Sequence, residues 1–265
     1  MKRILILLVA ALIAQGVSAQ YKIPKIVAHR GYCQEGIAPN NSIEALKMAQ
    51  REKFDMVEFD VNMSSDGELL VLHGIWHPGS KAENRIHCQW SSSSEIKAIP
   101  LSNGEKVPTF EEWIAQAAKC ETTKMLIEVK SHDTPALDAE VAAKIMAVLK
   151  KYNMVNKVYF LVGHEFLVRE LARITPKGTP IALTNNAYSP AFCHAIGCTI
   201  AGRTYDGWRR NQHLIKQARE LGLELMAWTV NNPEHIEWLV EQGFDYVLTD
   251  DPMMMRGVLN KRGNK

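Results

Sequence analysis

The sequence lacks several features that mark particular structural classes. It has only five cysteines, an odd number, and no Cys-x-x-Cys pair, which argues against a structural zinc site. It has 16 glycines and 11 prolines, close to average usage, which argues against collagen and low-complexity linkers. No sequence period of about 20 to 50 residues recurs, so repeat solenoids and propellers are also excluded.

Long hydrophobic runs are missing as well. The longest, Ile4–Ala14, has 11 residues, whereas a membrane-spanning helix needs about 20. Lys2 and Arg3 precede this run, and the small residues of Val17-Ser18-Ala19 follow it, which is the pattern of a secretory signal peptide. We therefore predict a signal peptide over residues 1–19, no stable membrane anchor, and an exported protein that is periplasmic or secreted.

An excess of one charge is the third missing feature. The chain has 31 basic and 29 acidic residues, and removal of residues 1–19, with two basic residues, leaves the two numbers equal. A balanced charge argues against nucleic acid or an anionic membrane surface as the partner. In an exported protein Cys193 and Cys198 either form a disulfide or are two unrelated buried thiols. The oligomeric state stays open.

What the sequence has is an alternation of short β-rich runs with helical stretches over the whole of residues 20–265. Such alternation predicts βαβ units around a parallel sheet, here as one domain. An open doubly wound sheet is the rival fold, but no glycine-rich phosphate loop follows the first strand. The predicted strands are Ile26–His29, Val57–Val61, Leu69–His73, Met125–Lys130, Val158–Val162, Pro180–Thr184, Thr199–Gly202, Leu223–Val230 and Tyr246–Thr249. The predicted helices are Ser42–Lys53, Phe110–Cys120, Leu137–Tyr152, His164–Ile174, Trp208–Leu221 and Pro233–Gln242.

The ninth strand has a local explanation. Only seven residues, with Asp66-Gly67 near their middle, separate Val57–Val61 from Leu69–His73, too few for a parallel crossover. These two runs are therefore expected to form a hairpin, with Asp60 opposite His73. The other eight strands then close a TIM (β/α)8 barrel, which carries a rim hairpin and, over residues 74–108, a small cap insertion after strand 2.

Polar residues gather at the carboxyl ends of these strands, where barrel active sites lie. Glu58 and Asp60, like Glu128 and Lys130, are two residues apart, so each pair points to one side of its strand. Three carboxylates without a thiol or an imidazole cluster suit a hard divalent cation, Mg²⁺ or Ca²⁺. The other candidates at strand ends are His29, Arg30, His73, Trp228 and Asp250.

Each candidate also has a simpler interpretation. A single histidine at a strand end is often structural, Glu58 and Asp60 suit an exposed edge strand, and Glu-x-Lys is often an ion pair. Two carboxylates also suit glycoside hydrolysis, which needs no particular histidine. The combination of these residues at one rim, rather than any single residue, favours a catalytic site.

In order along the chain, the motifs resemble those of the glycerophosphodiester phosphodiesterase family. They run from about Lys25 to Pro252 and are His29-Arg30-Gly31, Pro39-Asn40-Asn41-Ser42, Glu58-Phe59-Asp60-Val61, Asp66-Gly67, Val71-Leu72-His73, Glu128-Val129-Lys130, Trp228-Thr229-Val230-Asn231 and Thr249-Asp250-Asp251-Pro252. The resemblance implies a TIM barrel with an insertion after strand 2. It also implies metal-dependent hydrolysis of glycerophosphodiesters to glycerol 3-phosphate and an alcohol.

The resemblance assigns roles to individual positions. His29 and His73 would be the general acid and base, and a metal would be held by the carboxylates of Glu58, Asp60 and Glu128. Arg30 would bind the phosphate, with Lys130 beside it, and Trp228 would contact the substrate. The nucleophile would be the glycerol 2-hydroxyl, through a cyclic phosphate, and direct attack by water stays open.

Two positions depart from the family pattern. The family usually has Pro-Glu-Asn-Thr where this chain has Pro39-Asn40-Asn41-Ser42, and His-Asp where this chain has His73-Gly74. Neither departure removes a metal ligand or a catalytic histidine, but both bear on substrate preference and catalytic strength. The alternatives are therefore a phosphodiester-binding protein without turnover and a phospholipase-like lyase that stops at the cyclic phosphate. The head group of the substrate stays open.

Overall fold

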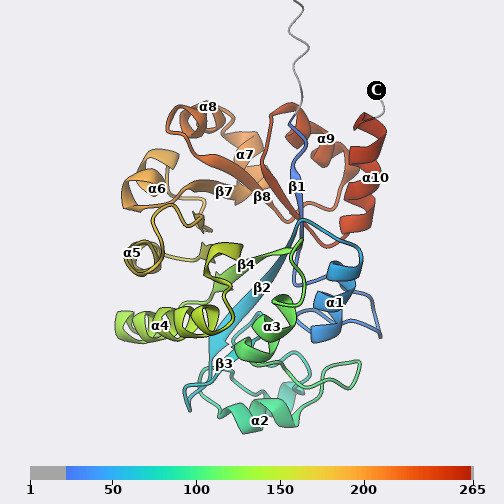
Figure 1. Ribbon diagram of the computed structural model, residues 1–265, viewed down its shortest axis with the longest axis vertical. Helices are drawn as coiled ribbons and strands as arrows, with labels where there is room; N and C mark the ends of the chain where they lie inside the picture. Colours follow the sequence, from blue (N-terminus) through green and yellow to red (C-terminus); the bar gives the residue numbers. More distant parts are fainter. Residues whose placement is uncertain (1–21, 264–265) are drawn as a thin grey trace, which may run out of the picture.

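The computed structural model describes residues 22–263, so the predicted signal peptide over residues 1–19 lies outside the described residues. Eight parallel strands form a closed barrel, because β1 pairs with both β2 and β9 (Figure 1). The predicted TIM barrel is confirmed. The strands are β1 (Lys25–Ala28), β2 (Met56–Met63), β3 (Leu69–Val71), β4 (Lys124–Val129), β5 (Val158–Val162), β6 (Ile181–Leu183), β7 (Ile200–Thr204), β8 (Glu224–Trp228) and β9 (Tyr246–Thr249).

Helices surround the barrel. Their positions agree with the prediction except for one predicted helix that is divided in two and three helices that were not predicted. The predicted helix Trp208–Leu221 is two helices, because the backbone of Asn211 leaves the helical region. The described residues also contain three helices that the sequence analysis missed, namely α2, α6 and α10. The helices are α1 (Ile43–Arg51), α2 (Ser93–Ala98), α3 (Phe110–Ala117), α4 (Pro135–Lys151), α5 (Glu165–Ile174), α6 (Pro190–Ile196), α7 (Tyr205–Arg210), α8 (His213–Glu220), α9 (Pro233–Glu241) and α10 (Pro252–Gly263), with short 3₁₀ helices η1 (Ala82–Asn84) and η2 (Val155–Lys157).

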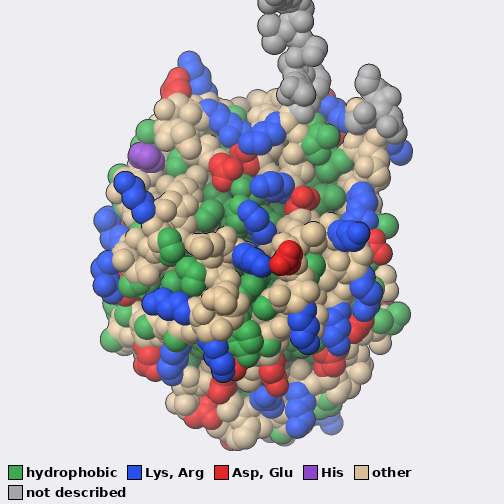
Figure 2. Space-filling view, viewed as in Figure 1, with side chains coloured by type: hydrophobic (Ala, Val, Ile, Leu, Met, Phe, Trp, Pro, Cys, Tyr) green, Lys and Arg blue, Asp and Glu red, His purple; other side chains and the backbone are tan. Residues whose placement is uncertain are grey.

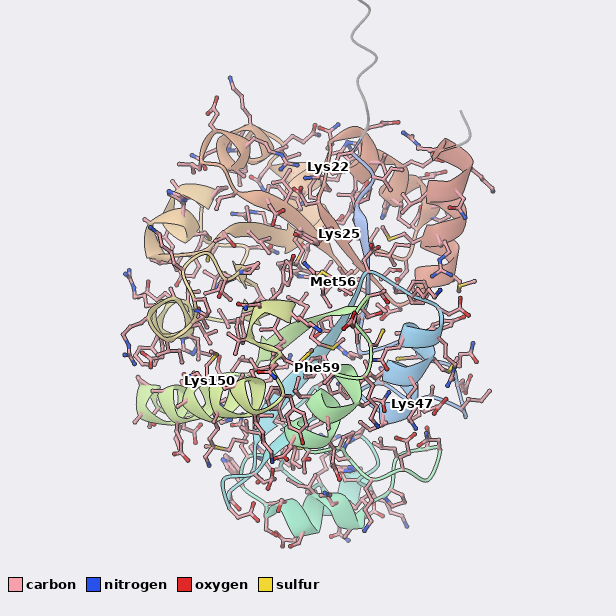
Figure 3. The ribbon with its side chains drawn as sticks, viewed as in Figure 1. Lys22, Lys25, Lys47, Met56, Phe59 and Lys150 are labelled. Atoms are coloured by element: carbon pink, nitrogen blue, oxygen red, sulfur yellow. The ribbon has the colours of Figure 1, made fainter. Side chains whose placement is uncertain are left out.

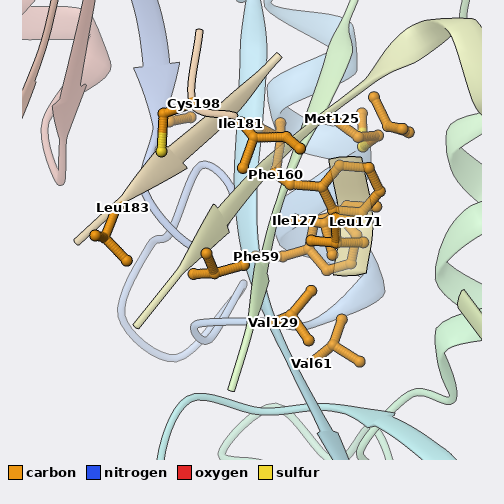
Figure 4. Packing of buried hydrophobic residues seen from close by; sticks show 14 of the residues in the cluster. Phe59, Val61, Met125, Ile127, Val129, Phe160, Leu171, Ile181, Leu183 and Cys198 are labelled. Carbon is orange, nitrogen blue, oxygen red and sulfur yellow. The ribbon is translucent and has the colours of Figure 1, made fainter. Parts of the chain in front are cut away.

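The alternation of side chains along the strands builds two apolar layers. Residues that point outward from the strands, such as Phe59 and Ile127, pack against the helices in the larger layer (Figure 4). Phe59 stacks on Trp113 of α3, with ring centroids 4.7 Å apart. Residues that point inward, such as Leu126 and Met56 (labelled in Figure 3), pack together inside the barrel. Farther along β2 and β4 the inward positions are Glu58, Asp60 and Glu128 in place of apolar residues, so the interior becomes charged toward the carboxyl ends.

The hairpin between β2 and β3 forms, but its predicted pairing is wrong by one residue. Val61 pairs with Val71 and Met63 with Leu69, a register that puts Leu72, rather than His73, opposite Asp60. The cause is the turn, which has three residues between Ser64 and Glu68 instead of two. The Gly67 N–H donates to the Ser64 carbonyl, and Gly67 has a φ of 82°, as in a type I turn followed by a bulge.

The cap that follows β3 has its own small core. Leu70 and Leu72 pack with Cys88, Ile96 and other buried apolar residues of residues 74–108. In Figure 1 α2 lies beside β3, at the end of the molecule opposite the carboxyl terminus. A cavity of about 200 Å³ joins the cap to the barrel rim. It is lined by Arg30, Asn40, Asn41, Val71, Leu72, His73, Gly74, Trp76, Pro78 and Leu101.

Surface charge, helix hydropathy and the cysteines do not by themselves indicate a class of function. On the face shown in Figure 2, Lys and Arg side chains are interspersed with Asp and Glu, as the balanced composition predicts. Across residues 22–263 no helix has the length and hydropathy needed to cross a membrane. All five cysteines are free thiols, and Cys193 and Cys198 are both buried.

Candidate functional site

Strands β2 and β4 bring the predicted acidic residues together toward the carboxyl end of the barrel. Carboxylate oxygens of Glu58, Asp60 and Glu128 all lie within 4.8 Å of one another. Asp60 and Glu128 are direct neighbours in the register between β2 and β4, and Glu58 precedes Asp60 on the same face. Glu58 and Asp60 are fully buried, whereas the Glu128 side chain is 20% exposed. The strand register thus brings together the three residues that the sequence predicts as metal ligands.

Two cations lie against this cluster. The Lys130 Nζ is 2.7 Å from Asp60 Oδ1 and 2.7 Å from Glu128 Oε1. Arg30 Nε is 3.5 Å from the second oxygen of Asp60, Oδ2. The two basic residues that the sequence predicts at the phosphate are therefore within the cluster, and they partly offset its negative charge.

The three carboxyl groups have different acidities because their partners differ. Burial, reinforced by the charges of Asp60 and Glu128, raises the pKa of Glu58 well above its usual value. Burial also raises the pKa of Glu128, against the attraction of Lys130. For Asp60 burial acts in the same direction, but the Lys130 ammonium and the Asn41 amide outweigh it and hold the pKa below its usual value. Asp60 is therefore the most firmly ionised member of the cluster.

The oxygens of the cluster fit a hard divalent cation. Glu58 Oε2 accepts a hydrogen bond from the Arg30 backbone N–H at 3.0 Å. Its other oxygen, Oε1, is buried and has no hydrogen-bond partner among the described residues. A buried carboxylate oxygen without a partner costs free energy, which a bound Mg²⁺ or Ca²⁺ with oxygen ligands would recover. The donor set thus fits the predicted divalent cation.

His29 is held at the edge of the cluster by a residue that the sequence analysis left without a role. Asp250, which directly follows β9, accepts a hydrogen bond from His29 Nδ1 at 2.6 Å. This bond lowers the pKa of Asp250 and places the ring proton on Nδ1. The other ring nitrogen, Nε2, then faces the cluster, 3.8 Å from Glu58 Oε2. The sequence does show an acidic residue, Asp250, after the last strand. It gives no sign that this residue contacts His29, which is 221 positions away.

Asn41 is a second residue that the sequence analysis missed. Its side-chain amide donates to Asp60 Oδ2 at 2.8 Å, and its side-chain oxygen accepts the Asp60 backbone N–H at 3.3 Å. Asn41 itself has a left-handed backbone, with a φ of 61°, and its N–H donates to the Arg30 carbonyl at 2.9 Å. Asn tolerates this conformation better than most residues, so its backbone and side chain both serve to orient Asp60.

The loop after β1 needs its glycine. Arg30 and Gly31 both have positive φ, at 59° and 93°. A Cβ on Gly31 would lie 2.6 Å from the Cβ of Ala45 and 2.9 Å from its carbonyl carbon. Gly31 therefore lets the loop approach α1 closely, in the turn that directs the Arg30 N–H to Glu58.

His73 reaches the site from a loop, two residues beyond the end of β3. The Asn62 side chain fixes this exit, because it donates to the Leu72 carbonyl at 2.8 Å. His73 lies close enough to Asp60, Lys130 and Arg30 to feel their charges, and it lines the same cavity as Arg30. Burial of the ring lowers the pKa of His73, which keeps the imidazole neutral at neutral pH.

Trp228 ends β8 and packs on the apolar residues inside the barrel. Its ring lies directly over Gly202 of β7, where any side chain would collide with it. The structure thus places Trp228 at the rim but gives it a packing role that sequence reasoning did not include. Two cavities larger than the one that His73 lines, of about 450 and 480 Å³, include none of the predicted site residues in their linings. It is the chemistry of the side chains, rather than cavity size, that marks the site.

Comparison with known proteins supports one family across the chain. Residues 29–254 match the Glycerophosphoryl diester phosphodiesterase family. A glycerophosphodiester phosphodiesterase of Bacillus subtilis (strain 168) is 28% identical over 263 residues, covering 88% of this chain and 85% of that protein. A glycerophosphodiester phosphodiesterase of Caldanaerobacter subterraneus subsp. tengcongensis is 25% identical, over 90% of this chain and 98% of that protein. The crystal structure of a glycerophosphodiester phosphodiesterase from Parabacteroides distasonis is similar, with 29% identity, a TM-score of 0.85, and coverage of 91% of this chain and 99% of that one.

Proposed function

The chain belongs to the glycerophosphodiester phosphodiesterase family, and on that premise we propose how its own residues carry out the reaction. In the proposal it hydrolyses glycerophosphodiesters to glycerol 3-phosphate and an alcohol, with one divalent cation, Mg²⁺ or Ca²⁺, held by Glu58, Asp60 and Glu128. The observation that carries it is the carboxylate cluster, with a histidine oriented beside it by Asp250.

Charge is the first requirement of the reaction. The nonbridging oxygens of a phosphodiester repel a nucleophile until cations neutralise them. Arg30 and Lys130 lie at the cluster and supply two positive charges. A divalent cation, if held by the three carboxylates, would supply Lewis-acid polarisation of the phosphoryl group.

Proton transfer is the second requirement. The lowered pKa of His73 leaves it neutral at neutral pH, so His73 is suited to accept the proton of the attacking hydroxyl. His29 shares a short hydrogen bond with Asp250 that holds its ring with Nε2 toward the cluster, so His29 is placed to donate a proton to the leaving alkoxide. The attacking hydroxyl is the glycerol 2-hydroxyl, through a cyclic phosphate, or a water molecule.

The two departures from the family motifs affect the alcohol half of the substrate rather than the reaction. Asn40 and Gly74 both line the cavity that joins the cap to the rim, and neither belongs to the metal cluster. Without acidic side chains at these positions, the cavity walls carry only one formal charge, that of Arg30. We therefore attach the choice of head group to the part of this cavity that Asn40 and Gly74 line, beside the catalytic His73 and Arg30.

The proposal is tested by the release of glycerol 3-phosphate from glycerophosphocholine and glycerophosphoethanolamine by protein lacking residues 1–19. Turnover is expected with Mg²⁺ or Ca²⁺ and none with EDTA. Release of a cyclic phosphate as the final product would support the lyase alternative. If correctly folded protein releases no product in any condition, a phosphodiester-binding protein that has lost turnover would instead be favoured.

Export is a separate part of the proposal and rests on residues 1–19 alone. The basic start, the 11-residue apolar run and the small residues before Gln20 support cleavage by a signal peptidase. Protein expressed in full length in a bacterial host is expected in the periplasm or medium, with Gln20 as its first residue by mass spectrometry. An uncleaved protein in the cytoplasmic fraction would refute export.

A further inference from the structure

Lys130 lies between two of the three carboxylates that would hold the metal. It follows β4 directly and is two residues past Glu128, so both side chains point into the same end of the barrel. Its Nζ is 2.7 Å from Asp60 Oδ1 and 2.7 Å from Glu128 Oε1, and the side chain is only 18% exposed. One ammonium thus bridges two carboxylates that belong to adjacent strands.

The oxygens that Lys130 contacts are the ones that a metal would need. The other oxygen of Asp60, Oδ2, already accepts the Asn41 amide at 2.8 Å and lies 3.5 Å from Arg30 Nε. Oδ1 is therefore the oxygen with which Asp60 would bind a metal. In this structure it forms an ion pair with the Lys130 ammonium. Glu58 Oε1 is also buried and has no hydrogen-bond partner among the described residues. Unlike Asp60 Oδ1, it forms no ion pair with Lys130.

We infer that the Lys130 ammonium and the divalent cation compete for Asp60 and Glu128, so that metal binding drives Lys130 out of the cluster toward the phosphate. The inference rests on the proposed metal-dependent function. A cation at about 2.0–2.6 Å from these oxygens would lie within a few ångströms of the Nζ. At that distance a dication and an ammonium repel each other strongly.

The chemistry of lysine suits this exchange. Its charge is compact and sits on a flexible four-carbon stem, so it can leave one set of oxygens and meet another nearby. Before metal binds, Lys130 neutralises carboxylates that would otherwise repel each other in a buried site. After metal binds, the displaced ammonium faces the anionic substrate. Metal and phosphate binding are then coupled, each favouring the other.

The test measures cation binding directly, by isothermal titration calorimetry of the protein with Mg²⁺ and with Ca²⁺. Lys130→Met is expected to bind the cation more tightly, by roughly 5- to 150-fold, because the competitor is gone. The same variant should melt at a lower temperature than wild type in EDTA, since Asp60 and Glu128 lose their shared counter-charge. The matched control is Lys124→Met, at the opposite end of the same strand, which should change neither value.

A second variant keeps the inference testable if Lys130→Met does not fold. Lys130→Gln keeps a hydrogen-bond donor between the carboxylates but removes the charge, and it too should bind the cation more tightly. In wild type, the affinity for inorganic phosphate should rise when the cation is present, and in Lys130→Gln this gain should shrink. Equal cation affinity in wild type and both variants would overturn the inference. A wild-type protein that binds neither ion would instead overturn the metal dependence in the proposed function, so the two failures are distinguishable.

Discussion

Replacement of His29 by alanine is expected to lower kcat by about 10²- to 10⁴-fold, the usual contribution of a general acid or base. The physical reason is that His29 is oriented for one task. Its Nδ1 is engaged by Asp250 at 2.6 Å, and its Nε2 faces the carboxylate cluster. The measurement is the steady-state release of glycerol 3-phosphate, together with circular dichroism to show that the variant is folded.

A histidine outside the carboxylate cluster, His164, provides the control for this prediction. His164 also pairs with an acid, since its Nε2 is 2.9 Å from the buried carboxylate of Asp138, but it is not part of the cluster. His164→Ala should keep near-wild-type kcat. If His29→Ala and His164→Ala lose activity equally, or if both retain it, His29 is not the proton donor and its contact with Asp250 is only structural.

Replacement of Glu58 by glutamine is expected to affect turnover and stability in opposite directions. Turnover should fall by about 100-fold or more, because even the outer partners of metal ligands typically contribute 10- to 100-fold. In EDTA the variant should be more stable than wild type. Its neutral side chain cannot acquire the buried charge that Asp60 and Glu128 oppose, and its amide offers these carboxylates a hydrogen-bond donor.

The expected gain is about 1 kcal/mol, equivalent to about 2–4 °C in Tm for a domain of this size. Thermal unfolding with EDTA and with saturating cation measures it, and the cation should raise the Tm of wild type far more than that of the variant. Glu140→Gln is the matched control, because Glu140 is an exposed acid that pairs with Lys144 on α4. A Glu58→Gln variant that is less stable in EDTA, or fully active with metal, would contradict the assignment of Glu58 as a ligand.

Local signals were sufficient for most of the secondary structure but not for all of it. Ser189-Pro190 and Gly197 mark the start and end of α6, and these start and stop signals were overlooked. The helix α10 has little amphipathic pattern to find. The pairing of β2 with β3 was mispredicted because Asp-Gly suits both a two-residue turn and a three-residue turn with a bulge. A change of one residue in a turn shifts the whole register.

The sequence by itself determined the barrel and the place of its chemistry. Side chains alternate along a strand and parallel strands share a carboxyl edge, so the spacing of Glu58, Asp60 and Glu128 was enough to predict one cluster. Only the tertiary structure decided how that cluster is supported. Asp250 and Asn41 acquire roles through contacts with His29 and Asp60 across 221 and 19 positions of the chain, and periodicity carries no information about such pairs. The competition that we assign to Lys130 likewise depends on which oxygens two adjacent strands present to one ammonium.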